Sequence, residues 1–188
     1  MERDVVDQME HAFALATAVL ERVEPDQWAA PTPCEGWTVR DVVNHMVGGA
    51  KIVSTELSGQ GEGVNYYVNH LRHRDPVDAY RDAAAEAVAV FRADPGLVER
   101  TIPMPWGPET GATVATMFMG DHFVHAWDVA KATGQDSDLD PDLAEMLMPF
   151  ARAYGDRHRG PGMFDDEKPV PAGASAADRL AAVLGRQV

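Results

Sequence analysis

The segment from Ala112 to Ala132 constrains the fold most, because it reads as one long helix that is apolar nearly all round. Its apolar side chains are Val114, Met117, Phe118, Val124, Trp127 and Val129. A helix with apolar residues on most of its surface is buried, so it needs other helices packed around it. The segment therefore predicts a helical fold with this element in its core.

Four titratable side chains interrupt this apolar helix, at Asp121, His122, His125 and Asp128. Residues three and four apart share one helix face, so Asp121 and His122 should both lie close to His125. Buried His and Asp side chains need partners, and a divalent metal ion suits both residue types. Asp128 could orient the His125 imidazole as a second carboxylate, or serve as a structural partner for a loop amide or an arginine.

A third candidate ligand lies far upstream, at His45, on a helix predicted from Val39 to Leu57. Helix bundles build metal sites from side chains on facing helices. The competing interpretation is that these side chains are hydrogen-bonded core residues or part of a solvated face. The two helices together favour a metal site formed by His45, Asp121 and His125, with His122 as an alternative ligand.

The rest of the chain also reads as helical. Further helices are predicted at 5–23, 76–91, 141–154 and 175–184, with a glycine-rich loop at 59–63, an extended arm at 101–106 and a turn at 107–111. Thr38 with Asp41 has the pattern of a variant capping box, and Gly134 suits a helix end. We expect one all-α four-helix-bundle domain over 1–188, with a core of about 5–157 and an extension of about 158–188 that ends in a short helix.

Charge and cysteine content exclude several classes of protein. The net charge is −14, with 30 acidic and 16 basic residues, which argues against nucleic acid and anionic membranes as partners. The single cysteine, Cys34, has no flanking base, and Glu35 would raise its pKa, so we do not expect a nucleophile there. With neither a signal sequence nor an apolar run long enough to cross a bilayer, we expect a cytoplasmic protein.

Two motifs resemble the mycothiol-dependent maleylpyruvate isomerase family of actinobacteria. They are TPCEGWTVRDVVNH at 32–45 and DHFVHAWDVA at 121–130. The ending, ASAADRL at 174–180 with LGR at 184–186, is similar to an actinobacterial subfamily of uncharacterised metal-binding relatives. The resemblance covers nearly the whole chain and implies a DinB-like four-helix bundle with an up-down-down-up arrangement.

The resemblance also implies a zinc site. Members of the family hold zinc with a His from the second helix and a Glu-x-x-x-His pair from a later helix. His45 matches the first ligand and His125 the last, while the Glu position falls on Asp121, which is one methylene shorter. His122 remains an alternative, and nickel remains an alternative to zinc.

The chemistry that the resemblance implies uses a low-molecular-weight thiol as co-substrate. Zinc would lower the pKa of the bound thiol, and the thiolate would attack a small electrophile, giving thiol transfer or isomerisation. Trp37, Arg40, Trp106 and Met117 are candidates for the walls of a pocket. The isomerase carries a further C-terminal domain that is not seen in this sequence, which argues against maleylpyruvate isomerase activity itself.

Two other functions remain open at this point. One is a metal-binding or sensing bundle without catalysis, and the other is a structural bundle with hydrogen-bonded His and Asp pairs. An open ligand position beside a pocket would favour catalysis, whereas a closed shell of four ligands would favour a structural role. The oligomeric state is open as well, with a homodimer as one alternative.

Overall fold

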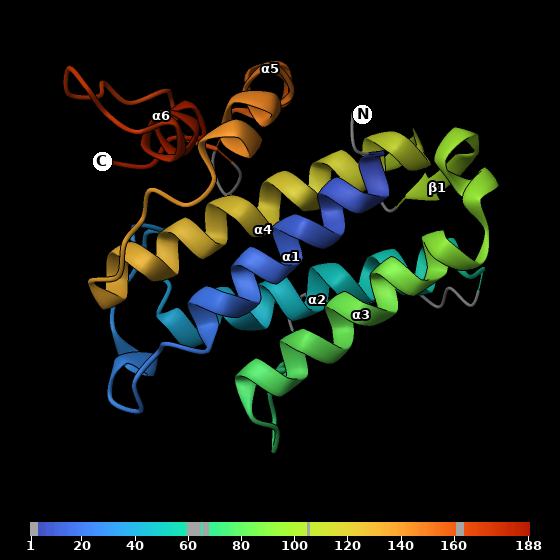
Figure 1. Ribbon diagram of the computed structural model, residues 1–188, viewed down its shortest axis with the longest axis horizontal. Helices are drawn as coiled ribbons and strands as arrows, with labels where there is room; N and C mark the ends of the chain where they lie inside the picture. The colour runs from blue at the N-terminus through green and yellow to red at the C-terminus, as the bar shows by residue number, and fades with distance from the viewer. Residues whose placement is uncertain (1–3, 60–64, 66–67, 105, 161–163) are drawn as a thin grey trace.

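Four long helices form a bundle in the computed structural model, which describes residues 4–59, 65, 68–104, 106–160 and 164–188. They are α1 (Val5–Leu20), α2 (Val39–Leu57), α3 (Pro76–Ala93) and α4 (Gly111–Thr133). In Figure 1, α1 and α4 run from right to left, whereas α2 and α3 run from left to right. The predicted all-α bundle with an up-down-down-up arrangement is therefore confirmed.

Capping interactions fix several helix ends where the sequence predicts them. The Asp41 N–H donates to Thr38 Oγ1 over 3.3 Å, and the Thr38 N–H donates to Asp41 Oδ2 over 3.0 Å, which completes the capping box at the start of α2. At the end of α4, Gly134 adopts the left-handed conformation, with φ at 69°. These caps set the limits of the two helices that carry the candidate ligands.

Two helix boundaries differ from the prediction by three residues or more. α1 ends at Leu20 and not at Val23, because the last turn tightens: the N–H groups of Arg22 and Val23 donate to carbonyls three residues back. Pro25 also disfavours the helical conformation at the residue before it. At the other end of the chain, α5 (Pro141–His158) runs one turn beyond the predicted end at Tyr154.

A two-stranded hairpin precedes α4, and here the predicted turn at 107–111 is wrong. β1 (Thr101–Met104) pairs antiparallel with β2 (Gly107–Thr110), so the reversal falls between Met104 and Gly107. Pro103 lies opposite Pro108 in the register. Neither proline can donate a ladder hydrogen bond, and such residues are tolerated in a hairpin because both of its strands are edges.

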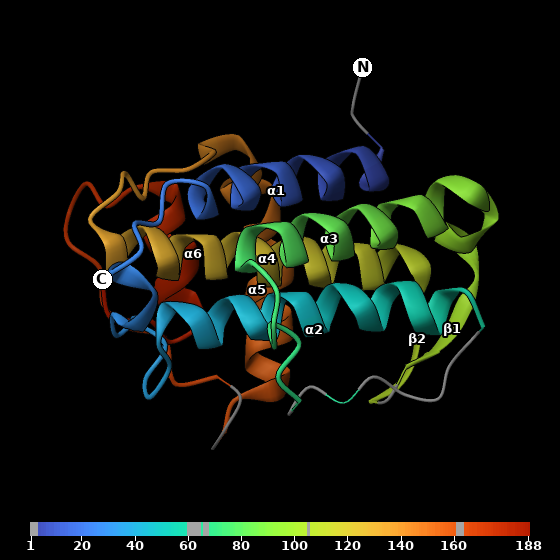
Figure 2. The same cartoon turned by 90° about the horizontal axis from the view of Figure 1, so that it is seen from below.

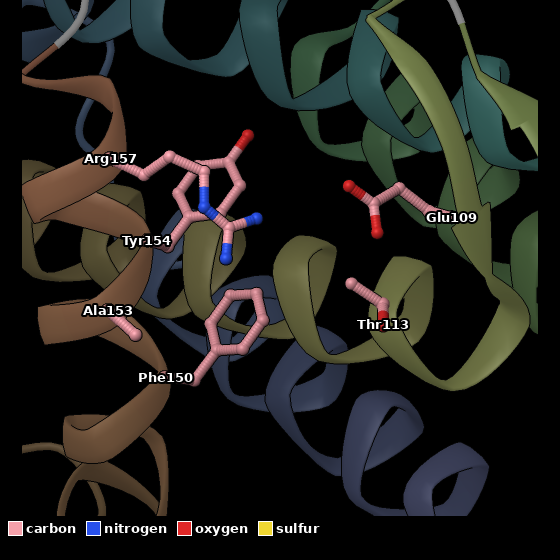
Figure 3. A pocket seen from close by; sticks show the side chains of 6 residues that line it. All are labelled: Glu109, Thr113, Phe150, Ala153, Tyr154 and Arg157. Atoms are coloured by element: carbon pink, nitrogen blue, oxygen red, sulfur yellow. The ribbon is translucent and has the colours of Figure 1, made fainter.

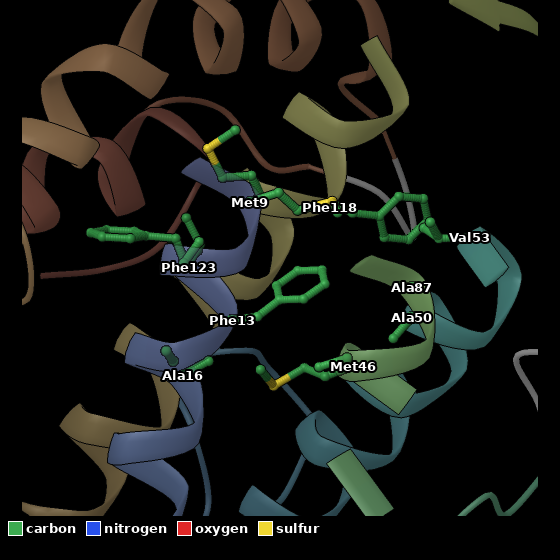
Figure 4. Packing of buried hydrophobic residues seen from close by; sticks show 14 of the residues in the cluster. Met9, Phe13, Ala16, Met46, Ala50, Val53, Ala87, Phe118 and Phe123 are labelled. Carbon is green, nitrogen blue, oxygen red and sulfur yellow. The ribbon is translucent and has the colours of Figure 1, made fainter. Parts of the chain in front are cut away.

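Side chains from all four bundle helices meet in one apolar core. Figure 4 shows Phe13 of α1 between side chains of the neighbouring helices, among them Met46 and Ala50 of α2 and Ala87 of α3. Most of α4 beyond Gly120 is buried, as its apolar composition predicts. The polar side chains of α4 are therefore held in a tightly packed environment.

The C-terminal part of the chain packs on the outer side of α4. α5 crosses the direction of the bundle, and α6 (Ala176–Val183) packs against both α5 and α4 (Figure 2). No helix among the described residues has the length and apolar character that crossing a bilayer requires. The α5–α6 unit thus leaves α4 enclosed by helices on more than one side.

Gly111, the first residue of α4, lies against the 3₁₀ turn η2 (Pro95–Glu99), so Gly111→Ala is expected to destabilise the fold. An added Cβ would lie 2.0 Å from the carbonyl oxygen of Leu97, and the backbone would have to move. Overpacking of this kind costs about 1–3 kcal/mol. Urea unfolding followed by circular dichroism measures the loss.

Gly120→Ala is the matched control in the same helix. The nearest neighbour of its added Cβ would be Leu147 Cδ2 at 3.7 Å, an ordinary contact. Alanine is the better helix former, so this variant should be as stable as the parent or more stable. Equal unfolding midpoints for the two variants would contradict the steric explanation for Gly111.

Candidate metal centre

His45 of α2 and three residues of α4 come together between these two antiparallel helices. His45 Nε2 lies 3.3 Å from Asp121 Oδ1, and His125 Nε2 lies 3.5 Å from the same oxygen. Among the described residues, His45, Asp121 and His125 form a group whose ligand atoms all lie within 4.8 Å of one another. Two residues that are 76 positions apart in the sequence thus meet through the packing of α2 on α4.

These separations suit ligands of one ion. Ligand atoms bound tetrahedrally to zinc at about 2.0–2.2 Å lie roughly 3.3–3.6 Å from one another. The donor set contains two imidazole nitrogens and one carboxylate oxygen, all of which zinc accepts. Asp121 Oδ2 and His122 Nε2 are buried and have no hydrogen-bond partner among the described residues. Buried polar atoms without a partner are costly, and a bound cation would satisfy Asp121.

His122 lies deeper in the core than the other two imidazoles. Its Nδ1 is hydrogen-bonded to the hydroxyl of Tyr80 over 2.8 Å, and its ring stacks on Phe13 with centroids 4.3 Å apart. Its Nε2 faces Asp121 Oδ2 at 3.9 Å and lies outside the group of three candidate ligands. Three imidazoles therefore surround one carboxylate, with His122 the most distant of them.

The electrostatics of the cluster favour a carboxylate at Asp121 and a neutral ring at His122, but they favour a proton on His45. Burial raises the pKa of Asp121, but the charges of His45 and His125 outweigh it, so the net pKa is well below the usual range. Burial lowers the pKa of His122 to about 3, and the ring is neutral at pH 7. For His45, burial opposes protonation, yet the charge of Asp121 and their hydrogen bond raise the pKa overall. A cation that displaced this proton would make binding pH-dependent.

The other nitrogen of His125 is held by Asp128. Nδ1 of His125 lies 2.9 Å from Asp128 Oδ2. Burial raises the pKa of Asp128, but the hydrogen bond from His125 and the charge of Arg186 outweigh it and lower the pKa overall, so Asp128 is a carboxylate that only accepts hydrogen bonds. The proton of neutral His125 must then be on Nδ1. Its Nε2 is left with a lone pair that faces the cluster, as metal-binding imidazoles require.

Arg186 completes this chain of contacts from outside the bundle. Its Nε donates to Asp128 Oδ1 over 3.1 Å, and its Nη2 donates to Asp128 Oδ2 over 3.1 Å. Asp128 is fully buried, and only 13% of the Arg186 side chain is exposed. Both roles considered for Asp128 from the sequence, orienting an imidazole and pairing with an arginine, are therefore present together.

The end of α6 places Arg186 in this position. The N–H of Gly185 donates to the carbonyl of Ala182, and the N–H of Arg186 donates to that of Ala181, which is the Schellman pattern. Gly185 has φ at 88°, which reverses the chain direction at a position that favours glycine. Sequence reasoning missed this role for Arg186. The available signal was a glycine followed by an arginine directly after a short helix.

Trp37 and Cys34 lie close to the cluster. The ring of Trp37 is 5.1 Å from that of His45 and 6.1 Å from that of His125, centroid to centroid. Burial raises the pKa of the Cys34 thiol, and the positive charge of Arg186 offsets this only in part. Cys34 is therefore a protonated thiol, in line with the expectation that it is not a nucleophile.

A cavity of about 240 Å³ lies between β2, the start of α4 and the C-terminal half of α5 (Figure 3). Its lining residues are Glu109, Thr113, Phe150, Ala153, Tyr154 and Arg157. None of the wall residues expected from the sequence, Trp37, Arg40, Trp106 and Met117, is among them. This cavity is therefore a different place from the pocket that those four residues were expected to line, and α5 supplies four of its six lining residues.

A family profile and two proteins of Mycobacterium tuberculosis match this chain. The family profile described as the mycothiol maleylpyruvate isomerase N-terminal domain matches residues 9–130. An uncharacterised protein of Mycobacterium tuberculosis is 42% identical over 179 residues, which cover 94% of this chain and 93% of that protein. A second uncharacterised protein of the same organism is 26% identical over 134 residues, covering 62% of this chain and 51% of its own length.

Among solved structures, the chain shares its fold with a mycothiol-dependent maleylpyruvate isomerase. The TM-score is 0.58 at 14% identity, and the match covers 80% of this chain and 68% of the other. The profile match spans the bundle helices from Met9 onward and includes all four candidate ligands. α5, α6 and Arg186 lie outside it.

Proposed function

Because the chain belongs to the family of the mycothiol maleylpyruvate isomerase N-terminal domain, we propose that it is a divalent-metal-binding protein that acts on a low-molecular-weight thiol. The observation that carries the proposal is the convergence of His45, Asp121 and His125, whose ligand atoms all lie within 4.8 Å of one another. Zinc is the leading ion for two imidazoles and a carboxylate, with nickel as the alternative. The reaction we propose is transfer of the thiol to a small electrophile, or isomerisation through such an adduct.

The chain's own residues would control both the position and the charge of the site. Asp128 holds the proton on His125 Nδ1 and fixes the ring, while Arg186 holds Asp128. Two neutral imidazoles and one carboxylate would leave a bound dication with a net positive charge. When bound, such an ion lowers the pKa of a coordinated thiol and so favours the nucleophilic thiolate. The ring of Trp37 lies beside both imidazoles and would form one wall of the site.

A non-catalytic metal-binding or sensing bundle is the second candidate. The observation that favours it is His122, whose buried Nε2 faces Asp121 at 3.9 Å. If His122 joined the other three residues, four protein ligands would close the shell, as in structural zinc sites. Three ligands and an open fourth position would instead leave room for a thiol.

The test is elemental analysis of untagged protein purified without chelator, together with His45→Ala. We expect about one zinc ion per chain in the parent protein and background zinc in the variant, because a three-ligand site loses one of its ligands. His73→Ala is the matched control, since His73 is an exposed imidazole in the loop before α3. Helix content from circular dichroism should be the same in all three proteins.

The outcomes separate the parts of the proposal. Absence of metal in the parent, even after zinc is added back, would overturn the metal site. Full zinc in His45→Ala would remove His45 from the ligand set. Thiol binding is tested on protein loaded with cobalt(II), where a coordinated thiolate adds a charge-transfer absorption band. A metal site that never gives this band with any thiol would support the non-catalytic candidate.

A further inference from the structure

The cavity in Figure 3 has opposite charges on its two walls. Glu109 of β2 faces into it from one side and Arg157 of α5 from the other. Neither side chain has an ion pair or hydrogen bond within the described part of the chain, although the neighbouring Arg152 pairs with Glu167 and Arg159 with Asp156. The Arg157 guanidinium is exposed beside the cavity and is available to an anionic ligand.

Aromatic rings form the floor of the same cavity. Phe150 and Tyr154 are one turn apart on α5 and stack, with ring centroids 5.5 Å apart and planes 13° apart. Thr113 adds a hydroxyl from the first turns of α4. Small-molecule sites typically combine apolar or aromatic surface with a few polar groups that fix the orientation of the ligand.

The cavity and the candidate metal centre both include residues of α4. The half-buried residues in the first part of this helix are Ala112, Thr113, Thr116, Met117, Gly120 and Asp121. Thr113, Met117 and Asp121 follow one another at helical spacing, and eight residues at 1.5 Å each span about 12 Å. Burial raises the pKa of Tyr154, which lines the cavity, and the negative charges of Asp121 and Glu109 raise it further. Thr113 of the cavity and Asp121 of the candidate metal centre are therefore two turns apart on α4.

We propose that this cavity binds the carboxylate end of an elongated small molecule whose other end reaches the group formed by His45, Asp121 and His125. Arg157 pairs with the ligand carboxylate, because the planar guanidinium matches it in a bidentate way. Glu109 accepts a hydrogen bond from a hydroxyl or ammonium group next to that carboxylate. A phosphate dianion is disfavoured, because Glu109 places a second negative charge on the facing wall.

This inference rests on the proposed function for the reacting end of the ligand, and its test uses thiols that carry a carboxylate. The probes are mercaptooctanoic acid, its neutral carboxamide analogue and the short thioglycolate, added to cobalt(II)-loaded protein. The charge-transfer band reports binding of each thiol. We expect mercaptooctanoic acid to bind about tenfold more tightly than the carboxamide, the ratio that one charge-assisted hydrogen-bonded contact gives. Thioglycolate is too short to reach Arg157 and should gain nothing from its carboxylate.

Three variants show which residues cause the preference for a thiol that carries a carboxylate. Arg157→Gln should remove the preference for the carboxylate, while Arg152→Gln, the matched control on the same helix, should keep it. Glu109→Gln should strengthen binding of mercaptooctanoic acid, because a facing negative charge is removed. A loss of packing would weaken binding in every case, so this gain distinguishes ligand contact from a structural role.

The two proposals fail in different ways. If all thiols give the band with equal affinity and Arg157→Gln changes nothing, the cavity proposal is overturned while the metal-thiol function stands. Octanoate binding is also measured by calorimetry on metal-free protein. Binding there that depends on Arg157, without any thiolate band, would support the cavity and overturn the thiol chemistry. Absence of both signals would overturn the cavity proposal as well.

Discussion

Asp121→Ala is expected to reduce bound zinc to background, whereas His122→Ala is expected to keep about one zinc ion per chain, as a three-ligand site requires. Asp121 is the carboxylate on which both His45 and His125 converge, at 3.3 and 3.5 Å. His122 directs its Nδ1 to Tyr80 and lies outside the group of three ligands. Elemental analysis after dialysis and competition with a chromophoric chelator measure the difference.

The same His122→Ala change is expected to lower the free energy of unfolding by about 2–4 kcal/mol, because it leaves a cavity and an unpaired hydroxyl. His122 is fully buried, stacked on Phe13 and bonded to Tyr80. Tyr80→Phe is the control: it removes the hydroxyl alone and should change neither the metal content nor the fold. Should His122→Ala not fold, His122→Asn serves in its place. Loss of zinc from folded His122 variants, with zinc retained in Asp121→Ala, would reverse the assignment.

Asp128→Ala is expected to destabilise the metal-free protein by about 3–5 kcal/mol, the usual result of removing one partner from a buried ion pair. Arg186 would keep a buried guanidinium with no carboxylate to accept its hydrogen bonds. His125 would lose the acceptor that holds its proton on Nδ1. Zinc affinity should fall by about 10–100-fold, the range seen when an outer carboxylate of a metal-bound imidazole is removed.

Two measurements separate the structural effect of Asp128 from its effect on the metal. Urea unfolding without metal gives the stability, and chelator competition below the unfolding transition gives the affinity. The double change Asp128→Leu with Arg186→Met removes both charges and should be less destabilising than Asp128→Ala alone. It should nevertheless bind zinc weakly. Wild-type zinc affinity in the double variant would show that the Arg186–Asp128 pair serves stability only.

Signals that act within one or two helical turns were sufficient to predict much of this molecule. The 112–132 segment has apolar residues on most of its helical surface, which predicts a buried helix. The spacing of Asp121 and His125 places the two residues on one face of that helix. The capping box at Thr38 and the glycine at 134 set helix ends in the structure as they do in the sequence. Each of these features depends on neighbours that are close in the chain.

Features that depend on tertiary contacts were not predictable in this way. Arg186 reaches Asp128 over 58 positions, and Tyr80 reaches His122 over 42. β2 was read as a turn because its strand character comes from pairing with β1 and not from its own composition, which is rich in Gly and Pro. The walls of the cavity depend on how α5 crosses α4, and nothing in the periodicity of either helix specifies that angle.

The distance in sequence between His45 and Asp121 also bears on kinetics. A chain must close a loop of 76 positions before the two side chains can meet, and this closure depends on the packing of α2 against α4. An ion that needs both residues therefore gains its full affinity only after the bundle has assembled. Stabilisation that arises after the folding transition state slows unfolding and leaves the folding rate nearly unchanged. Metal at this site would thus slow the unfolding of the bundle and lengthen the lifetime of the folded protein, without speeding its folding.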